Sequence, residues 1–479
     1  YGDHRDLHVR SRRQRQMCIR DSFTITSTDN AVNVNAIDFT QVSAINAGSS
    51  AGDSIVASGS AVNAELTSNN NEAVASAITF SNIDNADLNG GVLSGSASGD
   101  TFTLSGADLL ANQILFTAIH DAINANGGAD HVTGLAGVNW TLTGTNGAID
   151  STNYQFTGIE TANLLGQTLT GTNTDSETFT ITSAANAVNV NAIDFTQVSA
   201  IDAGSSASDS IVASGSAVNA ELTSSNNGLT ASTIDFSNIN NADLNDGELT
   251  GTNGNDETFT ITSTDNAVNV NAIDFTQVSA IDAGSSAGDS IVASGSAVNA
   301  ELISSNNGLT ASTIDFSNIN NADLNGGELT GTNTNSETFT ITSAANAVNV
   351  NAIDFTQVSA INAGSSAGDS IVASGSAVNA ELTSSNNEAV ASAITFSNID
   401  NADLNGGELI GTSGNDETFT ITSTDNAVNV NAIDFTQVSA INAGTSANDA
   451  IVTTELVNAD LTANDNGLMA SNISFTNIN

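Results

Sequence analysis

Residues 259–282 read FTITSTDNAVNVNAIDFTQVSAID, and this stretch decides how the chain folds. Copies of it begin at Phe23, Phe179, Phe339 and Phe419, with a diverged copy from Phe102. Residues 179–258 and 259–338 align without a gap and differ at seven positions. A fixed period of about 80 residues is typical of solenoids and repeat arrays. We therefore divide the chain into a non-native or disordered tail at 1–22 and repeats at 23–101, 102–178 (diverged), 179–258, 259–338, 339–418 and 419–479 (truncated).

The period divides again into units of about 40 residues, each marked by one phenylalanine. These twelve phenylalanines are Phe39, Phe80, Phe116, Phe156, Phe195, Phe236, Phe275, Phe316, Phe355, Phe396, Phe435 and Phe475. Each has an apolar residue two positions before it and Ser or Thr directly after it. Short apolar/polar alternation between clusters of Gly, Asn, Ser and Asp predicts short strands separated by turns.

An isolated 40-residue unit buries too little apolar surface to be stable, whereas stacked copies bury a continuous strip. We therefore predict an all-β fold, an elongated parallel β-solenoid whose 40-residue units pair into 80-residue repeats. With coils of roughly 20 residues and 4.8 Å per coil, the rod would be on the order of 110 Å long. Phe275, Phe316 and Phe355 should then lie inside, on one strip. Tandem Ig-like β-sandwiches are the alternative, although they provide no reason for a 40-residue half-period.

The composition excludes several kinds of site and partner. The chain has 52 acidic residues and six basic ones, a formal net charge of −46. All six basic residues and the one cysteine lie in the first 20 positions, so the repeats offer no disulfide, thiolate, lysine or arginine chemistry. Nothing in the repeats neutralises phosphate, so we expect no nucleic-acid partner. No apolar run is long enough for a transmembrane segment.

The tail at residues 1–22 differs in composition from everything after it. RQRQMCIRDS at its end resembles a translated sequencing-adapter tail, which implies that the segment is not native. A basic arm that binds an acidic partner is the alternative. We expect both natural ends of the protein to lie outside this sequence, and deletion of 1–22 to leave stability unchanged.

The equivalent acids of successive repeats are predicted to lie far apart. In stacked 20-residue coils, Asp274 and Asp354 would be four coils and roughly 19 Å apart. This exceeds the Debye length of about 8 Å at physiological ionic strength. We therefore expect ions to act mainly by screening.

Aspartates in the Gly-rich turns are the candidate metal ligands. They are Asp53, Asp130, Asp209, Asp289, Asp369 and Asp449, each at the same distance after a marker phenylalanine, with Asp100, Asp256 and Asp416 in the longer turns. Oxygen ligands suit Ca²⁺, and these turns match the calcium-roll nonapeptide in part. Ser176 and Ser336 replace the acid in two of the longer turns, and the turns are not consecutive. Two interpretations stay open: aspartates that bond their own turn, and weak Ca²⁺ binding; we expect no other cofactor.

Two further segments invite a chemical interpretation. GSSAG at 48–52, 284–288 and 364–368 matches the nucleophile elbow of hydrolases, but it lies between strand-like segments, so we interpret it as a turn. Residues 106–128 of the diverged repeat fit either a drifted coil or an inserted amphipathic helix.

The motif F-[ST]-x-[IV] followed by a Gly-rich, Asp-bearing turn resembles the repeat regions of large bacterial surface proteins. Filamentous-haemagglutinin-like adhesins, calcium-roll adhesins and S-layer proteins share this Thr/Asn/Ala/Gly-rich, lysine-poor style. The resemblance implies a non-enzymatic stalk or body of a secreted or cell-surface adhesin. It would have the cell surface, matrix or polysaccharide, or a second copy, as partner. An S-layer-type coat is the first alternative, and a β-helical polysaccharide-active enzyme is a minor one.

Overall fold

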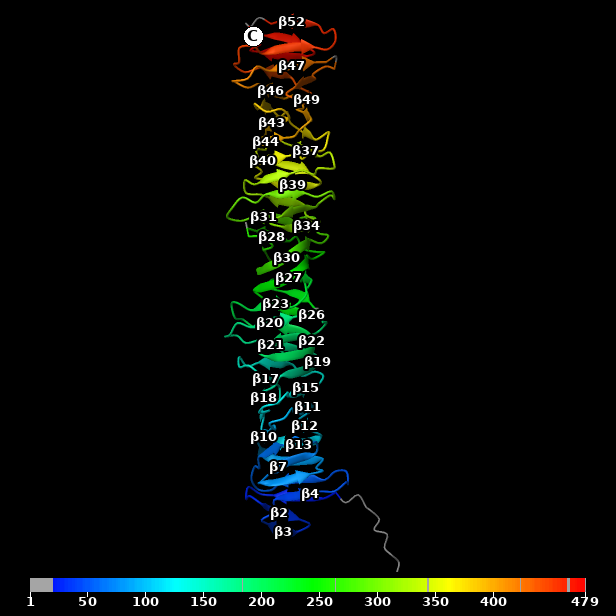
Figure 1. Ribbon diagram of the computed structural model, residues 1–479, viewed down its shortest axis with the longest axis vertical. Helices are drawn as coiled ribbons and strands as arrows, with labels where there is room; N and C mark the ends of the chain where they lie inside the picture. Colours follow the sequence, from blue (N-terminus) through cyan, green and yellow to red (C-terminus); the bar gives the residue numbers. More distant parts are fainter. Residues whose placement is uncertain are drawn as a thin grey trace, which may run out of the picture. The chain divides into compact units, whose positions relative to one another are not determined.

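The computed structural model describes residues 20–182, 184–262, 264–342, 344–422, 424–462 and 466–478. These residues form strands and turns without a helix, so the all-β prediction is confirmed. The chain comprises two compact units. Unit 1 contains the residues up to Asp209 together with Ser232–Asn238, and unit 2 contains Ser210–Ala231 together with Ile239–Asn479. Within each unit the coils follow one another in chain order (Figure 1).

Parallel pairing between successive coils defines the solenoid. In unit 2, β28 (Thr258–Ile261) pairs with β31 (Ser290–Ala293), and β31 pairs with β35 (Asn321–Asp323). The aligned residues are Phe259, Ile291 and Ala322, so a coil takes about 32 residues. Unit 1 repeats this pairing from β1 (Ser22–Ile25) to β5 (Ser54–Ala57). The parallel β-solenoid is therefore confirmed, the sandwich alternative is wrong, and the expected 20-residue coil is too short.

An antiparallel triplet of strands accounts for the 40-residue unit. β28 turns back into β29 (Val268–Val270), which turns forward into β30 (Ile273–Asp282). The second turn is the pair Asn271–Ala272 with φ of 50° and 62°, the conformation of a two-residue type I′ hairpin. The marker phenylalanine, Phe275 here, lies in the third strand of its triplet. Each triplet inserts two extra strands, which a plain 20-residue coil does not contain.

The core lies between two ladders of strands. Phe275 and Phe355 belong to one ladder, in which Ala322 pairs with Phe355. Phe316, in β34 (Ile314–Ser317), belongs to the other ladder, where it pairs with Ile281. All three phenylalanines are buried, but they do not share one strip, because consecutive units place their triplets in alternate ladders.

The ladder also corrects the expected spacing of equivalent acids. From Asp274 to Asp354 the strand order in unit 2 is β30, β29, β28, β31, β35 and β39 (Ile353–Thr356). These are five steps, or about 24 Å at the usual strand spacing.

In most units an asparagine nine residues before the marker phenylalanine joins one triplet to the next; Ala107 and Gly147 occupy this position in the diverged repeat. In unit 2, Asn266 has φ of 56°, and its side-chain amide donates to Val278 O at 3.0 Å. Its backbone N–H donates to Ser312 O in the next triplet at 2.9 Å. The equivalents with the same backbone bond are Asn30, Asn71, Asn186, Asn227, Asn307, Asn346, Asn387 and Asn426. Asparagine tolerates this left-handed conformation better than most residues, which explains its recurrence.

The diverged repeat keeps the coil. Residues 106–128 form β12 (Asp108–Ala111), β13 (Ile114–Ile119) and β14 (Ala122–Asn124), so the helix interpretation is wrong. The Tyr154 hydroxyl donates to Ala107 O at 2.7 Å. The first coil starts slightly earlier than expected, because Ser22 already belongs to β1. The interpretation of residues 1–19 lies outside the described residues. The described part of the chain contains no helix long and apolar enough to cross a membrane.

Candidate functional site

Pairs of acids, nearly all of them buried, connect neighbouring coils beside the Gly-rich turns. Glu257 is 2% exposed and Asp289 is 0% exposed, and the Glu257 N–H donates to Asp289 Oδ1 at 2.8 Å. The same bond joins Asp21 to Asp53 (2.8 Å), Asp100 to Asp130 (2.7 Å), Glu177 to Asp209 (2.9 Å), Glu337 to Asp369 (2.7 Å) and Glu417 to Asp449 (2.9 Å). We call these six the acid pairs.

The register of the solenoid brings the two acids of a pair together. Glu257 immediately precedes β28 and Asp289 immediately precedes β31, and these strands pair in parallel. Thr252 Oγ1 donates to Glu257 Oε1 at 2.6 Å, and the Thr252 N–H donates to Oε2 at 3.3 Å. The turn must be glycine at Gly284 (φ 93°), because a Cβ there would lie 2.2 Å from Thr252 O. Close approach of the two turns thus excludes water from the acids.

In several repeats, a polar residue of the following coil forms a hydrogen bond with the second acid of the pair. The Asp289 carbonyl accepts the N–H groups of Asn320 and Asn321 at 2.9 and 3.1 Å. In unit 1, Glu160 Oε2 accepts the Asp130 N–H at 2.7 Å. Acids separated by 30 residues, as in Asp130 and Glu160, or by 32 residues, as in Glu257 and Asp289, therefore lie in adjacent coils. The expectation of wide spacing concerned only equivalent acids such as Asp274 and Asp354, and these non-equivalent acids lie much closer together.

Burial makes it costly for both acids of a pair to be charged. Asp289 Oδ2 is buried without a hydrogen-bond partner. Burial, together with the neighbouring Glu257 charge, raises the pKa of Asp289 to about 6. In unit 1, burial and the Asp100 charge raise the pKa of Asp130 to about 6. Burial also raises the pKa values of Glu337 and Glu417. We infer that the Glu257–Asp289 and Asp100–Asp130 pairs each hold one proton over part of the physiological pH range.

The nine predicted calcium ligands fall into two groups. Asp53, Asp130, Asp209, Asp289, Asp369 and Asp449 are wholly buried, as is Asp100, and all of them belong to acid pairs. Asp256 and Asp416 are exposed and bind the turn of the next coil: Asp256 Oδ1 accepts the Gly288 N–H at 3.1 Å, and Asp416 Oδ2 accepts from the Asn448 side chain at 3.1 Å. Hydrogen bonds from Ser446 and Asn448 lower the pKa of Asp416.

Each acid pair supplies two carboxylates. Ca²⁺ takes six to eight oxygen ligands. Among the described residues, no three or more His, Cys, Asp or Glu side chains converge in a metal-binding arrangement. In the Glu257–Asp289 pair, three of the four carboxyl oxygens already accept hydrogen bonds. The arrangement suits a shared proton better than a chelated ion.

The hydrolase-like turns and the histidines have structural contacts. Ser286 donates to Asp256, and Ser366 Oγ lies 3.0 Å from Asp369 Oδ2. His131 contacts Thr161 Oγ1 at 2.8 Å and Thr133 Oγ1 at 3.1 Å, and burial lowers its pKa.

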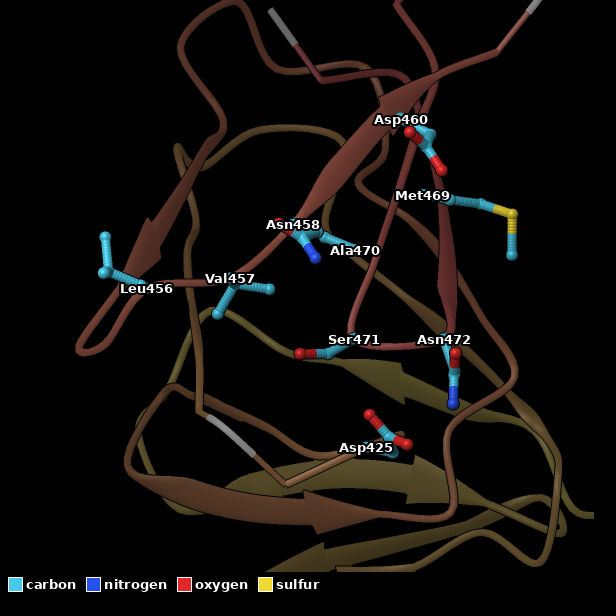
Figure 2. A pocket seen from close by; sticks show the side chains of 9 residues that line it. All are labelled: Asp425, Leu456, Val457, Asn458, Asp460, Met469, Ala470, Ser471 and Asn472. Atoms are coloured by element: carbon cyan, nitrogen blue, oxygen red, sulfur yellow. The ribbon is translucent and has the colours of Figure 1, made fainter.

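A hollow of about 380 Å³ lies beside the last coil of unit 2 (Figure 2). Asp425 points toward Ser471 and Asn472, whereas the Met469 side chain points away. Leu456 is 105% exposed and Leu461 is 89% exposed in the same coil.

Sequence reasoning missed the first acid of most pairs. An acid stands two residues before the opening phenylalanine in all six repeats, as Asp21, Asp100, Glu177, Glu257, Glu337 and Glu417. This constancy was the available signal, since Ser336 shows that the acid one position earlier is not retained.

Comparison with known proteins gives no match among family models, curated proteins or solved structures.

Proposed function

We propose that the chain is a non-enzymatic structural segment, the stalk or body of an extracellular bacterial surface adhesin. The observation that supports this is that the same three structural features recur along the chain: the strand triplets, the asparagines that join successive triplets, and the acid pairs. Each of them serves coil stacking. Because the repeats are nearly uniform, the same residues recur at equivalent positions, as the acid pairs do, and no single repeat stands out by its acid pair.

A stalk must be long and stiff, and its expected length follows from the coil geometry. A repeat advances five strand positions, about 24 Å, so residues 23–479 acting as one stalk would span about 140 Å. Such a rod has a radius of gyration of about 40 Å, whereas a compact chain of this size has one of about 23 Å. Small-angle scattering on the full chain in 0.15 M NaCl distinguishes the two. A value close to the compact one would overturn the stalk proposal.

The S-layer alternative is favoured by the exposed acids that carry no basic partner, such as Asp256 and Asp416. In a coat, divalent cations would bridge such acids between copies. Electron microscopy after addition of millimolar Ca²⁺ tests this directly. Ordered two-dimensional arrays would favour the coat, and dispersed particles would favour the stalk. Release of sugars from polysaccharides by the purified chain would instead favour the enzyme.

A further inference from the structure

Asparagine followed directly by glycine recurs in the turns of the repeats, as at Asn227, Asn253, Asn307 and Asn325. In such a pair the glycine nitrogen can attack the carbon of the asparagine side-chain amide, because no glycine Cβ shields it. The attack needs an amide that can rotate toward the backbone and a glycine N–H that is not held in a hydrogen bond. The structure therefore separates the protected pairs from the reactive ones.

Hydrogen bonds hold several of these pairs. The Asn307 amide nitrogen donates to Ile319 O at 2.9 Å and to Ala352 O at 3.2 Å, so the amide cannot turn toward the next residue without losing both bonds. Asn227 is bound in the same way. In other pairs the glycine N–H is the bonded group: Gly147 donates to Asn191 O at 2.9 Å, Gly326 to Gln357 O at 2.6 Å and Gly406 to Gln437 O at 2.7 Å.

Asn253 lacks both kinds of protection. Asn253 and Gly254 are exposed in the turn before Glu257. Within the described ranges, neither the Asn253 side chain nor the Gly254 N–H has a hydrogen-bond partner. Apart from its chain neighbours, no atom lies within 4 Å of the position that a Cβ of Gly254 would take. Nothing in the surroundings therefore hinders the attack.

The equivalent asparagines of two other turns are tethered to the next coil. Asn333 Oδ1 accepts the Ser365 N–H at 3.1 Å and the Ser365 hydroxyl at 3.0 Å. Asn173 Oδ1 binds Ser205 in the same way, at 3.0 Å from both groups. Each of these asparagines is followed by threonine, whose branched Cβ crowds the backbone nitrogen. These positions are therefore both tethered and sterically hindered.

An aspartate three residues later explains why Asn253 is free. Asp256 holds the facing turn of the next coil, through the Ser286 hydroxyl and the Gly288 N–H. In the turns where asparagine makes that contact, Ser176 and Ser336 replace the acid. In the turn at 251–257 the tether therefore passes from the asparagine to the acid.

We propose that Asn253 is a site of spontaneous deamidation, with water as the co-reactant. The Gly254 nitrogen gives its proton to hydroxide and attacks Asn253 Cγ, and the new N–Cγ bond closes a cyclic succinimide. The Cγ–Nδ2 bond breaks, and Nδ2 leaves as ammonia after taking a proton from water. Water then opens the ring at either carbonyl, which leaves aspartate or isoaspartate.

The product differs from its precursor in charge and, as isoaspartate, in backbone length. A further carboxylate joins a turn that already contains Asp256 and Glu257, and the repeats contain no lysine or arginine to pair with it. We therefore expect the chain to become more acidic with age at this turn, while the tethered turns keep their charge.

Incubation of the full chain at pH 8, followed by peptide mass spectrometry, tests the proposal. A glutamate-specific protease releases LTGTNGNDE (249–257) and its matched counterpart LTGTNTNSE (329–337), so the two turns are compared in one sample. We expect conversion to aspartate and isoaspartate at Asn253 and not at Asn333. Asn307 should react at least about tenfold more slowly than Asn253, because a side-chain hydrogen bond must break first. In urea this difference between Asn253 and Asn307 should disappear.

Two variants test the residues that the reaction requires. Gly254→Thr recreates the dipeptide of the tethered turns and should block conversion at Asn253. Ser413→Asn gives residues 411–417 the same GTNGNDE sequence and should introduce a second reacting position there. Both positions are exposed, and each new residue already occurs in an equivalent turn, so the fold should survive the change. If Asn253 stays an amide, or reacts no faster than Asn307 in the folded chain, the proposal is wrong.

Discussion

The acid pairs predict that the protein loses stability as the pH rises from 5 to 8. Asp289 has a pKa of about 6 in the folded chain, against an ordinary value of 3.8. A folded pKa above the unfolded one means that the stabilising contribution is complete below pH 3.8 and is lost as the pH rises through 6. A difference of about 2.2 pKa units corresponds to about 3 kcal/mol for this one group. Asp130 in unit 1 should behave in the same way.

Asp289→Asn isolates this contribution, because asparagine can still accept the Glu257 N–H but does not titrate. Urea unfolding at pH 5 and pH 8 should show that the parent loses more free energy of unfolding between the two pH values than the variant, by about 1.4 kcal/mol, because only the last pKa unit of the shift lies above pH 5. Asp265→Asn is the matched control, since this acid is exposed, belongs to no acid pair and should leave the pH dependence unchanged. If the parent were more stable at pH 8 than at pH 5, or if Asp289→Asn kept the parent's pH dependence, the shared-proton interpretation would be refuted.

Three further perturbations test the fold and its charge. Asn266→Ala should lower the free energy of unfolding by about 1 to 3 kcal/mol in urea titrations, because a backbone acceptor loses its bond and the left-handed turn loses its preferred residue. The control Asn269→Ala, whose side chain only meets Asp274 at the surface, should cost under about 0.5 kcal/mol. Phe275→Ala should cost about 3 to 5 kcal/mol in the same assay, whereas Phe39→Ala, at a side chain that is 45% exposed, should cost clearly less. The melting temperature should rise with NaCl, and millimolar Ca²⁺ should add a modest increase; calorimetric titration showing tight binding near one ion per 40-residue unit would contradict the scarcity of metal ligands.

The fold class could be predicted from the sequence because the repeat is so regular. The spacing of Phe275, Phe316 and Phe355 gave the 40-residue unit, and alternation gave the strands. The coil length could not be obtained in this way, because sequence periodicity does not show that one strand of each unit runs backward. The turn at Asn271–Ala272 was the available clue, since an Asn-containing pair between alternating segments is a hairpin signal.

For most acid pairs, the sequence predicted only one of the two acids. The aspartates such as Asp289 stood out because they follow the marker phenylalanine at a fixed distance. Their partners did not, because Glu257 is far from Asp289 in the sequence, and only the coil length places the two side by side. Because the coil length was unknown, the expectation of weak charge interactions considered only the distance between the equivalent acids Asp274 and Asp354. It did not consider acids in neighbouring coils.

Cross-linking across one coil tests the parallel register of the solenoid most directly. Thr258 and Ser290 are aligned neighbours on β28 and β31, and their hydroxyl oxygens lie 3.3 Å apart. In a chain carrying Cys18→Ser, the pair Thr258→Cys and Ser290→Cys should form a disulfide on mild oxidation, because adjacent strands place Cα atoms within the range of about 4.4 to 6.8 Å that a disulfide needs. The pair Thr258→Cys and Val278→Cys, aligned only in a 20-residue coil, should stay reduced. A disulfide in the second pair but not in the first would contradict the solenoid register on which the acid pairs depend.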